Sequence, residues 1–347
     1  MTHPLIGAEA LGHLLADSPN RVRVFDVRHD LVDHAAGRRA YDAGHIPGAI
    51  HIDHETELAA AKTGKNGRHP LPQPEVFAAH MATLGVTPDT HVVAYDASGG
   101  MYAAHLWWML NWIGHRNVQV LDGGWQAWVA AGLKQQTATP ADQSLTQPTA
   151  QATGRATENA TGHATKQASH LATEQAGNQA TEQAGNQATE QATDQATQQA
   201  TQQSTAKVTS FGDGTMEAVD ADAVLANIHN PAFTVLDARA APRYRGEVEP
   251  MDPVAGHIPG ALNRPNTGNL GEDGRFKSAD TLREEYLALL KGVPAEQVVH
   301  QCGSGITATH NLLAMEVAGL SGSRLYPGSW SEWVSDSSRP VATGEKP

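Results

Sequence analysis

The chain has 347 residues, a formal net charge of −13 and 40% hydrophobic residues. Because the balance is acidic and no cluster of Lys or Arg stands out, nucleic acid and membrane surfaces are poor candidate partners. A single cysteine excludes an intrachain disulfide framework and fits a reducing compartment. No secretory signal and no apolar run of transmembrane length is visible, so we expect a cytoplasmic protein.

The chain holds 18 histidines, which invites a metal-binding interpretation. They are scattered, however, and neither an HExxH motif nor paired cysteines with zinc-ligand spacing occurs. We therefore expect no metal site and assign most histidines to the surface or to capping positions.

Strands and helices alternate along the first part of the chain. Apolar, strand-like runs occupy 21–27, 90–95 and 118–121, and helical patterns occupy 74–84, 101–113 and a short segment around Trp128. The same order returns near the C-terminus, with strands expected at 233–236 and 297–299 and a helix at 307–319. Alternation of this kind predicts an α/β fold with a mainly parallel sheet and helices on both faces.

Several motifs occur twice. The turn Gly-His-Ile-Pro-Gly-Ala at 44–49 returns at 256–261, and the tryptophan segment that begins at 123 returns at 328. The two copies stand at a nearly constant separation of about 205–212 residues. The sequence thus predicts two tandem domains, 1–136 and 211–347.

The segment 137–210 between these domains is rich in Ala, Thr and Gln, with alanine at every fourth position over much of its length. It has almost no large apolar side chains and cannot offset the entropy of ordering a chain. We expect a disordered linker, and a Gln-rich interaction tract is the alternative on composition.

The duplication provides an internal control. The strand-end pairs Asp26/Asp237 and Arg28/Arg239 occur in both halves and are expected to be structural. In contrast, Cys302 of the second half stands where the first half has Asp96. Since an aspartate cannot carry out sulfur chemistry, only the second domain is expected to be catalytic.

Cys302 follows a predicted strand and precedes a predicted helix. Backbone N–H groups of such a glycine-containing loop, together with the helix N-terminus, stabilise a thiolate. A buried, inert cysteine is the alternative, which the flanking glycines and the charged Asp96 at the matching place disfavour. Only His300, two residues earlier, is a local candidate for a base.

Two arginines, Arg243 and Arg245, belong to the second half only, because Val32 and His34 stand at the matching places. Both follow the end of a strand, where an arginine can bind a small anionic substrate. Ion pairing with Glu247 or Glu249 is the alternative.

Taken together, CGSGITAT, the two GHIPGA turns, DAR…RYRGE and YPGSWSEW closely resemble the two-domain rhodanese-like sulfurtransferases, which include thiosulfate and 3-mercaptopyruvate sulfurtransferases. The resemblance implies two tandem rhodanese-like domains. It also implies that Cys302 accepts a sulfur from a small anionic donor as a persulfide and passes it to cyanide or to a thiol such as thioredoxin. The loop residues expected to hold the persulfide are Gly303, Ser304, Gly305, Ile306 and Thr307. No metal or organic cofactor is implied.

The neutral loop after Cys302 is similar to that of the mercaptopyruvate branch. In that branch the residues matching Ser304 and His45 assist at the cleft, and the residue matching Arg243 binds substrate. The chain departs from that pattern at Met251, where a second substrate arginine is expected. A phosphatase of related fold would need an arginine at Ala308, and a non-catalytic sulfur carrier remains a further alternative.

Overall fold

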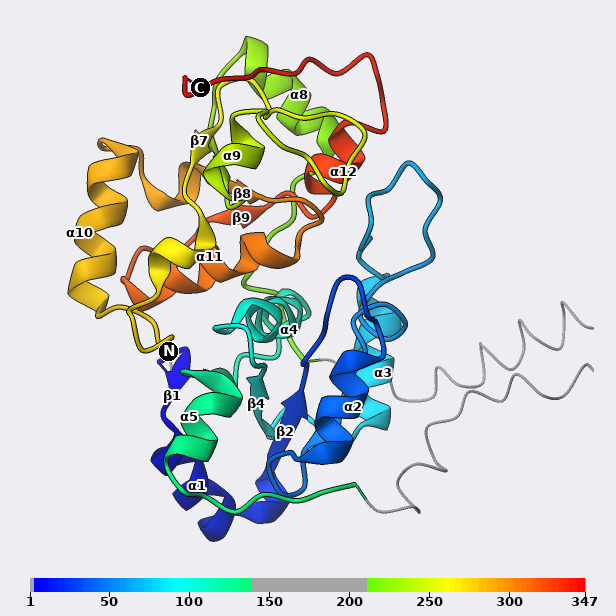
Figure 1. The fold of residues 1–347 in the computed structure, drawn as a ribbon, viewed down its shortest axis with the longest axis vertical. Coiled ribbons are helices and arrows are strands. Elements are labelled where there is room, and N and C mark those ends of the chain that lie inside the picture. Colours follow the sequence, from blue (N-terminus) through cyan, green and yellow to red (C-terminus); the bar gives the residue numbers. More distant parts are fainter. Residues whose placement is uncertain (1–2, 139–210, 347) are drawn as a thin grey trace, which may run out of the picture. The chain divides into compact units, whose positions relative to one another are not determined.

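The computed structural model describes residues 3–138 and 211–346 (Figure 1). All but the first two residues of the expected linker lie outside the described residues, so its predicted disorder remains a prediction. The described residues belong to one compact unit that contains both halves of the duplication.

The first half is built on a parallel sheet with the strand order β1-β5-β4-β2-β3. Its strands are β1 (Leu5–Ile6), β2 (Val22–Asp26), β3 (Ile50–His51), β4 (His91–Tyr95) and β5 (Val118–Leu121). The central strands carry continuous apolar runs because helices cover both faces: Val92, Val93 and Ala94 have no exposed surface.

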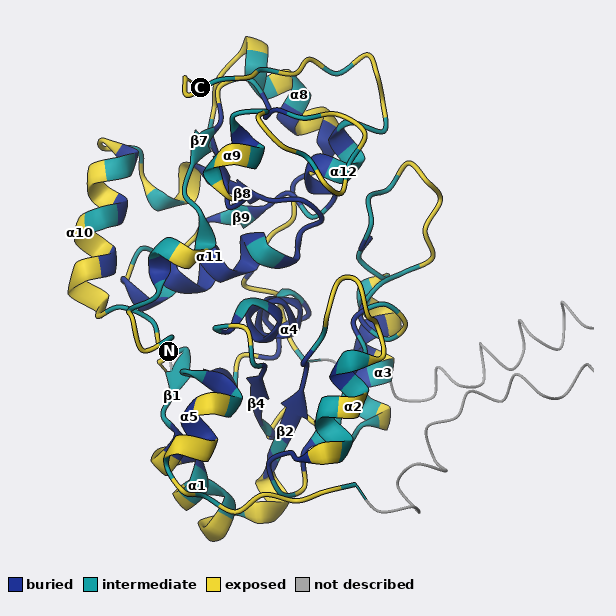
Figure 2. Ribbon diagram, in the orientation of Figure 1, coloured by how far each residue is buried: buried dark blue, intermediate teal, exposed yellow. Residues whose placement is uncertain are grey.

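The helices of this half are α1 (Ala8–Asp17), α2 (Ala36–Ala43), α3 (Pro74–Thr83), α4 (Met101–Trp112) and α5 (Gly124–Ala130), and η1 (Pro19–Arg21) is a 3₁₀ turn. Helix α3 begins at Pro74, where the missing N–H costs no hydrogen bond. Helix α4 is apolar on all sides and buried nearly throughout (Figure 2). A helix of that kind must be covered both by its own sheet and by a second element.

The second half repeats the design with the strand order β7-β6-β8-β9, again all parallel. Its strands are β6 (Thr234–Asp237), β7 (Leu262–Asn263), β8 (Val298–Gln301) and β9 (Arg324–Leu325). Its helices are α8 (Ala221–His229), α9 (Ala241–Tyr244), α10 (Ala279–Leu290), α11 (Ile306–Val317) and α12 (Ser329–Trp333), with 3₁₀ turns η2 (Asn266–Asn269) and η3 (Ala295–Gln297). The side chains of Asp220 and Ser278 cap α8 and α10 by accepting hydrogen bonds from backbone N–H groups.

The predicted α/β class with parallel sheets is confirmed, and the paired strand-end residues are structural as expected. In each half the arginine forms a buried salt bridge with the aspartate, Arg28 with Asp26 and Arg239 with Asp237. Each guanidinium also lies over a tryptophan ring, at 4.8 Å in the first half and 4.6 Å in the second. This repeated unit ties the strand end to the tryptophan segment.

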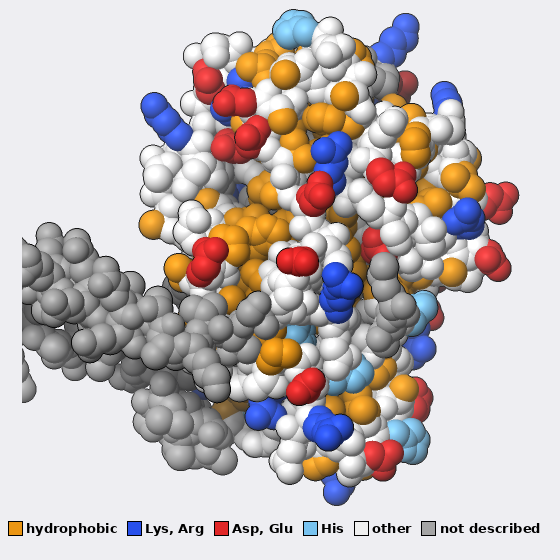
Figure 3. Space-filling view, turned by 180° about the vertical axis from the view of Figure 1, so that it is seen from behind, with side chains coloured by type: hydrophobic (Ala, Val, Ile, Leu, Met, Phe, Trp, Pro, Cys, Tyr) orange, Lys and Arg blue, Asp and Glu red, His pale blue; other side chains and the backbone are white. Residues whose placement is uncertain are grey.

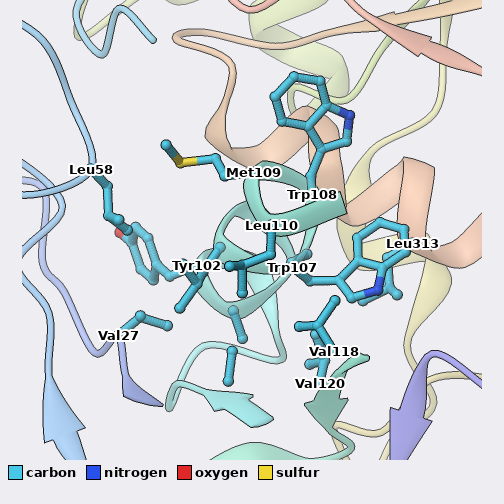
Figure 4. Packing of buried hydrophobic residues seen from close by; sticks show 14 of the residues in the cluster. Val27, Leu58, Tyr102, Trp107, Trp108, Met109, Leu110, Val118, Val120 and Leu313 are labelled. Atoms are coloured by element: carbon cyan, nitrogen blue, oxygen red, sulfur yellow. The ribbon is translucent and has the colours of Figure 1, made fainter. Parts of the chain in front are cut away.

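The two halves meet along α4 and α11. A single cluster of buried apolar residues crosses this contact, joining Trp107 and Trp108 of α4 to Leu313 of α11 (Figure 4). Cys302 and Ile306 belong to the same cluster. The loop before α11 is therefore placed against the first half by the apolar packing between the two domains.

Candidate active site

Cys302 directly follows β8, and α11 begins four residues later at Ile306. The turn depends on Gly305, whose φ of 90° lies in the left-handed region, and a Cβ added there would lie 2.4 Å from the Pro327 carbonyl oxygen. The α12 segment anchors the backbone: Cys302 N–H donates to Ser329 Oγ at 3.0 Å, and Trp330 N–H donates to the Cys302 carbonyl at 3.0 Å. The cysteine is 1% exposed.

The matching loop of the first half shows what this arrangement can hold. The carboxylate of Asp96 accepts hydrogen bonds from the N–H groups of Ser98, Gly100, Tyr102 and Ala103 at 2.7–2.9 Å. Burial raises the pKa of Asp96, and these four donors offset part of that rise. The loop at the start of α4 is thus a cradle for a buried acidic group, at the place where the second half has its cysteine.

A cavity of about 170 Å³ opens beside Cys302 and is lined by both halves. The first half contributes Leu31, Arg68, Met101 and Tyr102, and the second half contributes Ala238, Arg239, Ala240, Arg243, Met251, Asn266, Cys302, Gly303, Ser304, Ile306 and Thr307. The size suits a small molecule of a few heavy atoms, and the wall combines apolar side chains with guanidinium groups.

Two of these guanidinium groups lie next to Gly303. A Cβ added at Gly303 would lie 2.8 Å from Arg68 Nη2 and 3.6 Å from Arg243 Nη2. Arg243 pairs with Glu249 at 2.6 Å and with Asp252 at 3.4 Å, and Arg68 also forms an ion pair with Asp252. The expected alternatives for Arg243 are thus both realised, since it lines the cavity and pairs with Glu249.

The structure brings most of the predicted site residues together. Cys302, Gly303, Ser304, Ile306, Thr307 and Arg243 line the cavity, and Gly305 precedes α11 immediately behind them. Arg245 does not join them: it pairs with Glu247 at 2.7 Å and is absent from the cavity wall. The expectation for Arg245 is corrected accordingly: it forms a partly exposed ion pair with Glu247 and lies outside the cavity wall.

His45 also differs from the expectation. Its ring stacks on Tyr41 at 3.8 Å and its Nδ1 lies 2.8 Å from the Tyr41 carbonyl. His257 of the second half makes the same two contacts with Tyr244. The histidine of each GHIPGA turn therefore fixes the turn to the preceding helix, and His45 does not line the cavity.

The histidine that reaches the cysteine loop is His69. Its Nδ1 lies 2.8 Å from Ser304 Oγ, and its Nε2 lies 2.6 Å from Glu55 Oε1. Burial raises the pKa of Glu55, but hydrogen bonds from Lys62 and His69 outweigh this effect and lower the pKa to about 2. An ionised Glu55 fixes the Nε2–H tautomer, so the His69 Nδ1 lone pair accepts a hydrogen bond from the Ser304 hydroxyl.

The sequence carries a signal for His69 in a further difference between the two halves. Gly67-Arg68-His69 of the first half matches Gly274-Arg275-Phe276 of the second. Phe276 in turn approaches the Asp96 loop, where a Cβ on Gly100 would lie 3.3 Å from its ring. In each half, one side chain from this segment therefore lies against the loop of the other half. The sequence shows that this side chain is His69 in the first half and Phe276 in the second.

The expectation that most histidines lie on the surface is wrong for many of those described. Buried histidines include His45, His54, His69, His105, His115, His257, His300 and His310. Burial lowers the pKa of His300 to about 3, and its ring nitrogens have no hydrogen-bond partner among the described residues. His300 is absent from the cavity wall, so it is not placed to act as a base for Cys302.

Comparison with known proteins defines the class. The family model of the rhodanese-like domain matches twice, at residues 8–131 and 220–336. The SseA 3-mercaptopyruvate sulfotransferase structure from Escherichia coli superposes with a TM-score of 0.63 at 26% identity, covering 95% of this chain and 99% of that one. The chain belongs to the rhodanese-like family and has two copies of its domain.

Individual relatives add the activity. A Pseudomonas aeruginosa relative that carries the name 3-mercaptopyruvate sulfurtransferase is 40% identical over 93% of this chain and 92% of its own length. The human 3-mercaptopyruvate sulfurtransferase is 32% identical, covering 85% and 79% respectively. A Mycobacterium tuberculosis relative, SseB, at 33% identity over 98% and 96%, carries the name of a thiosulfate sulfurtransferase. The protein is a sulfurtransferase, which requires a sulfur donor and an acceptor.

None of the described helices is long and apolar enough to cross a membrane. On the face shown in Figure 3, Lys and Arg side chains are interspersed with Asp and Glu rather than gathered in one basic area.

Proposed function

We propose that the protein transfers sulfur from 3-mercaptopyruvate through a persulfide on Cys302. The observation that carries this proposal is the chain of contacts Ser304–His69–Glu55, which ends at a hydroxyl in the cysteine loop. Such a chain moves protons. Mercaptopyruvate carries a thiol proton that must move during the reaction, whereas thiosulfate carries none, so the chain fits the former donor.

The Cys302 thiolate attacks the mercaptopyruvate sulfur, an S–S bond forms and the C–S bond breaks, with its electron pair passing to the leaving enolate of pyruvate. Ser304 takes the thiol proton while passing its own to His69 Nδ1, and the relay returns a proton to the leaving carbon. The products are pyruvate and an anionic persulfide.

The loop amides of residues 303–307 are proposed to hold that persulfide. Support comes from the equivalent loop, in which four amides bind the Asp96 carboxylate. Because the terminal sulfur of a persulfide extends farther than a thiolate, it would lie where an anion is stabilised by preorganised N–H donors. An acceptor thiolate or cyanide then attacks this sulfur and releases the Cys302 thiolate.

The charges around the cavity favour a donor with a single negative charge. Three arginines, Arg68, Arg239 and Arg243, are matched by three carboxylates, Asp237, Glu249 and Asp252. A site with balanced charge has less to offer thiosulfate, a dianion, than a strongly cationic site would. Arg68 and Arg243 are proposed to bind the donor carboxylate. Arg68 would supply the second guanidinium, since Met251 stands where the relatives' second substrate arginine is expected.

The acceptor and the compartment follow from the same chemistry. The cavity is small, so a protein acceptor must present an exposed thiol at its mouth, as a thioredoxin does. Thiol acceptors are available in a reducing compartment, which the single cysteine also fits. We propose a cytoplasmic enzyme with a thioredoxin-type or low-molecular-weight thiol as acceptor.

Steady-state sulfur transfer to cyanide with each donor tests this function. We expect kcat/KM to be higher with 3-mercaptopyruvate than with thiosulfate. Arg68→Met and Arg243→Met should each lower kcat/KM by about 10–100-fold, mainly through KM, since a charge-assisted hydrogen bond contributes about 1.5–3 kcal/mol. Arg245→Met serves as the matched control and should leave both constants unchanged.

Two outcomes would contradict the proposal. Faster turnover with thiosulfate would overturn the donor assignment. An equal loss of activity in the Arg245→Met variant would show that general charge, rather than contact with the substrate, is being measured.

A further inference from the structure

A group of metal-ligating side chains lies beside the relay but outside the cavity. His29 and His34 come from the loop after β2, and Glu55 comes from the loop after β3. The His34 Nδ1 lies 3.7 Å from Glu55 Oε1, and the His29 Nε2 lies 4.0 Å from the same oxygen. All three candidate ligand atoms lie within 4.8 Å of one another.

His29 gives an independent reason to expect a ligand. Its side chain is 2% exposed, yet its Nε2 has no hydrogen-bond partner among the described residues. A buried nitrogen without a partner costs free energy that a bound cation would recover.

The donor set indicates the class of metal. Two imidazole nitrogens and one carboxylate oxygen suit Zn²⁺ and its transition-metal neighbours, whereas Mg²⁺ and Ca²⁺ prefer oxygen ligands. Zinc bonds to these atoms are about 2.0–2.2 Å long, so the ligands must close in around the ion. His34, whose side chain is 55% exposed, is free to rotate inward and leaves an entry path from solvent.

The same Glu55 oxygen links this group to the active site. Oε1 accepts the hydrogen bond from His69 Nε2 at 2.6 Å, and Lys62 pairs with Oε2 at 2.6 Å. A cation on Oε1 withdraws negative charge from the atom that fixes the His69 tautomer. Lys62 opposes a second cation, which should hold the affinity well below that of a structural zinc site.

We propose that a divalent transition-metal ion of the zinc class binds His29, His34 and Glu55 and inhibits the enzyme by weakening the Glu55–His69 contact. The binding part stands on the geometry alone. The inhibitory part rests on the proposed function, because it requires His69 to act in sulfur transfer.

Calorimetric titration of the full-length Cys302→Ser protein with ZnCl₂ tests the binding part without interference from the thiolate. We expect adding His34→Ala to weaken one site at least 10-fold. The matched control is His13→Ala, which removes an exposed histidine on α1 and should leave the isotherm unchanged. Identical isotherms with and without His34→Ala would overturn the site.

Turnover under increasing ZnCl₂ tests the inhibitory part in the protein with an intact Cys302. Zinc also binds thiolates. The readout is therefore the difference in zinc inhibition between wild type and His34→Ala, with each activity normalised to its value without metal. We expect His34→Ala to require at least 10-fold more zinc for half inhibition. Equal inhibition of both proteins would overturn the regulatory role. If the protein showed no turnover even without metal, the proposed function would be contradicted. The zinc isotherms alone would then decide whether the metal site exists.

Discussion

At the scale of single residues, the site is assembled from side chains far apart in the sequence. Ser304 of the second half contacts His69 of the first. The Arg68 guanidinium of the first half lies next to Gly303 in the cysteine loop. Neither domain alone contains the full set, since Cys302 and Ser304 belong to the second half and His69 and Glu55 to the first. We infer one reaction centre built from both copies, to which the first copy contributes His69 and Glu55.

Removing His69 tests this division of labour. Without it, the Ser304 hydroxyl has no acceptor for its proton, so we expect His69→Ala to lower kcat with 3-mercaptopyruvate by about 100-fold, in the range of a lost acid–base group. KM should change little because His69 is not part of the cavity wall.

The pH profile separates this role from a structural one. Burial lowers the pKa of His69 although Glu55 opposes this effect, so the ring stays neutral until the pH falls below its ordinary value of 6.5. Activity should fall as His69 becomes protonated on the acidic side, and this limb should vanish in His69→Ala. An unchanged acidic limb would contradict the relay.

Residue-level prediction from sequence succeeded where a difference between the halves was compared directly. Cys302 against Asp96 and Arg243 against Val32 both led to residues of the cavity wall. His45 and Arg245 failed because a motif or a short spacing was taken as proximity, whereas stacking on Tyr41 and pairing with Glu247 fix them elsewhere. The contact between His69 and Ser304 depends on how the domains pack, which no local pattern encodes.

At the scale of secondary-structure elements, the turn between β8 and α11 sets the position of the cysteine. The sequence predicted a strand, a glycine loop and a helix there, and the structure shows β8 ending at Gln301 and α11 starting at Ile306. The amphipathic helices α1 and α10 were not predicted, although Leu282, Tyr286 and Leu290 of α10 recur at the spacing of one buried helix face.

Replacing Gly305 with alanine tests whether this turn must be so tight. A left-handed backbone costs an alanine about 1–2 kcal/mol, and a Cβ here would also lie 2.4 Å from the Pro327 carbonyl oxygen. The loop must shift to relieve that contact, so we expect activity to fall at least 10-fold.

Gly260→Ala provides a matched control. Its φ of 83° carries the same backbone cost, but an added Cβ there meets nothing within 4 Å. We expect a loss of unfolding free energy of about 1 kcal/mol in denaturant titrations, with full activity. Equal activity of the two variants would refute the importance of the close approach to Pro327.

At the scale of the whole molecule, buried histidines make stability depend on pH. Burial lowers the pKa of His105 and of His300 to about 3 and that of His310 to about 4. In the unfolded chain these rings take up protons near pH 6.5, whereas in the folded chain they do not. The unfolded state therefore binds more protons below pH 6.5, and the free energy of unfolding falls as the pH decreases.

The expected size is large. At pH 5 each of these three histidines should lower the free energy of unfolding by roughly 2 kcal/mol relative to pH 8. Urea titrations followed by tryptophan fluorescence would measure it, and His105→Leu should reduce the pH dependence whatever its effect at pH 8. A midpoint that stays constant between pH 8 and pH 5 would show that the buried rings are protonated in the folded protein.

The fold as a whole was accessible from sequence because strand patterns, turns and the repeat all indicated the same architecture. The packing of α4 against α11 was not, since both helices are apolar on several faces and such helices do not reveal their partner. That packing places the first half against the cysteine loop, where its His69 and Arg68 lie next to Ser304 and Gly303.

The proposed mechanism requires that Cys302 carries the sulfur. The most direct measurement is a single turnover with 3-mercaptopyruvate, without acceptor, followed by mass spectrometry of the intact protein and its peptides. We expect one added sulfur atom on the peptide that contains Cys302, one equivalent of pyruvate, and neither product with Cys302→Ser. Pyruvate released at an undiminished rate by Cys302→Ser, or sulfur found on another residue, would contradict it.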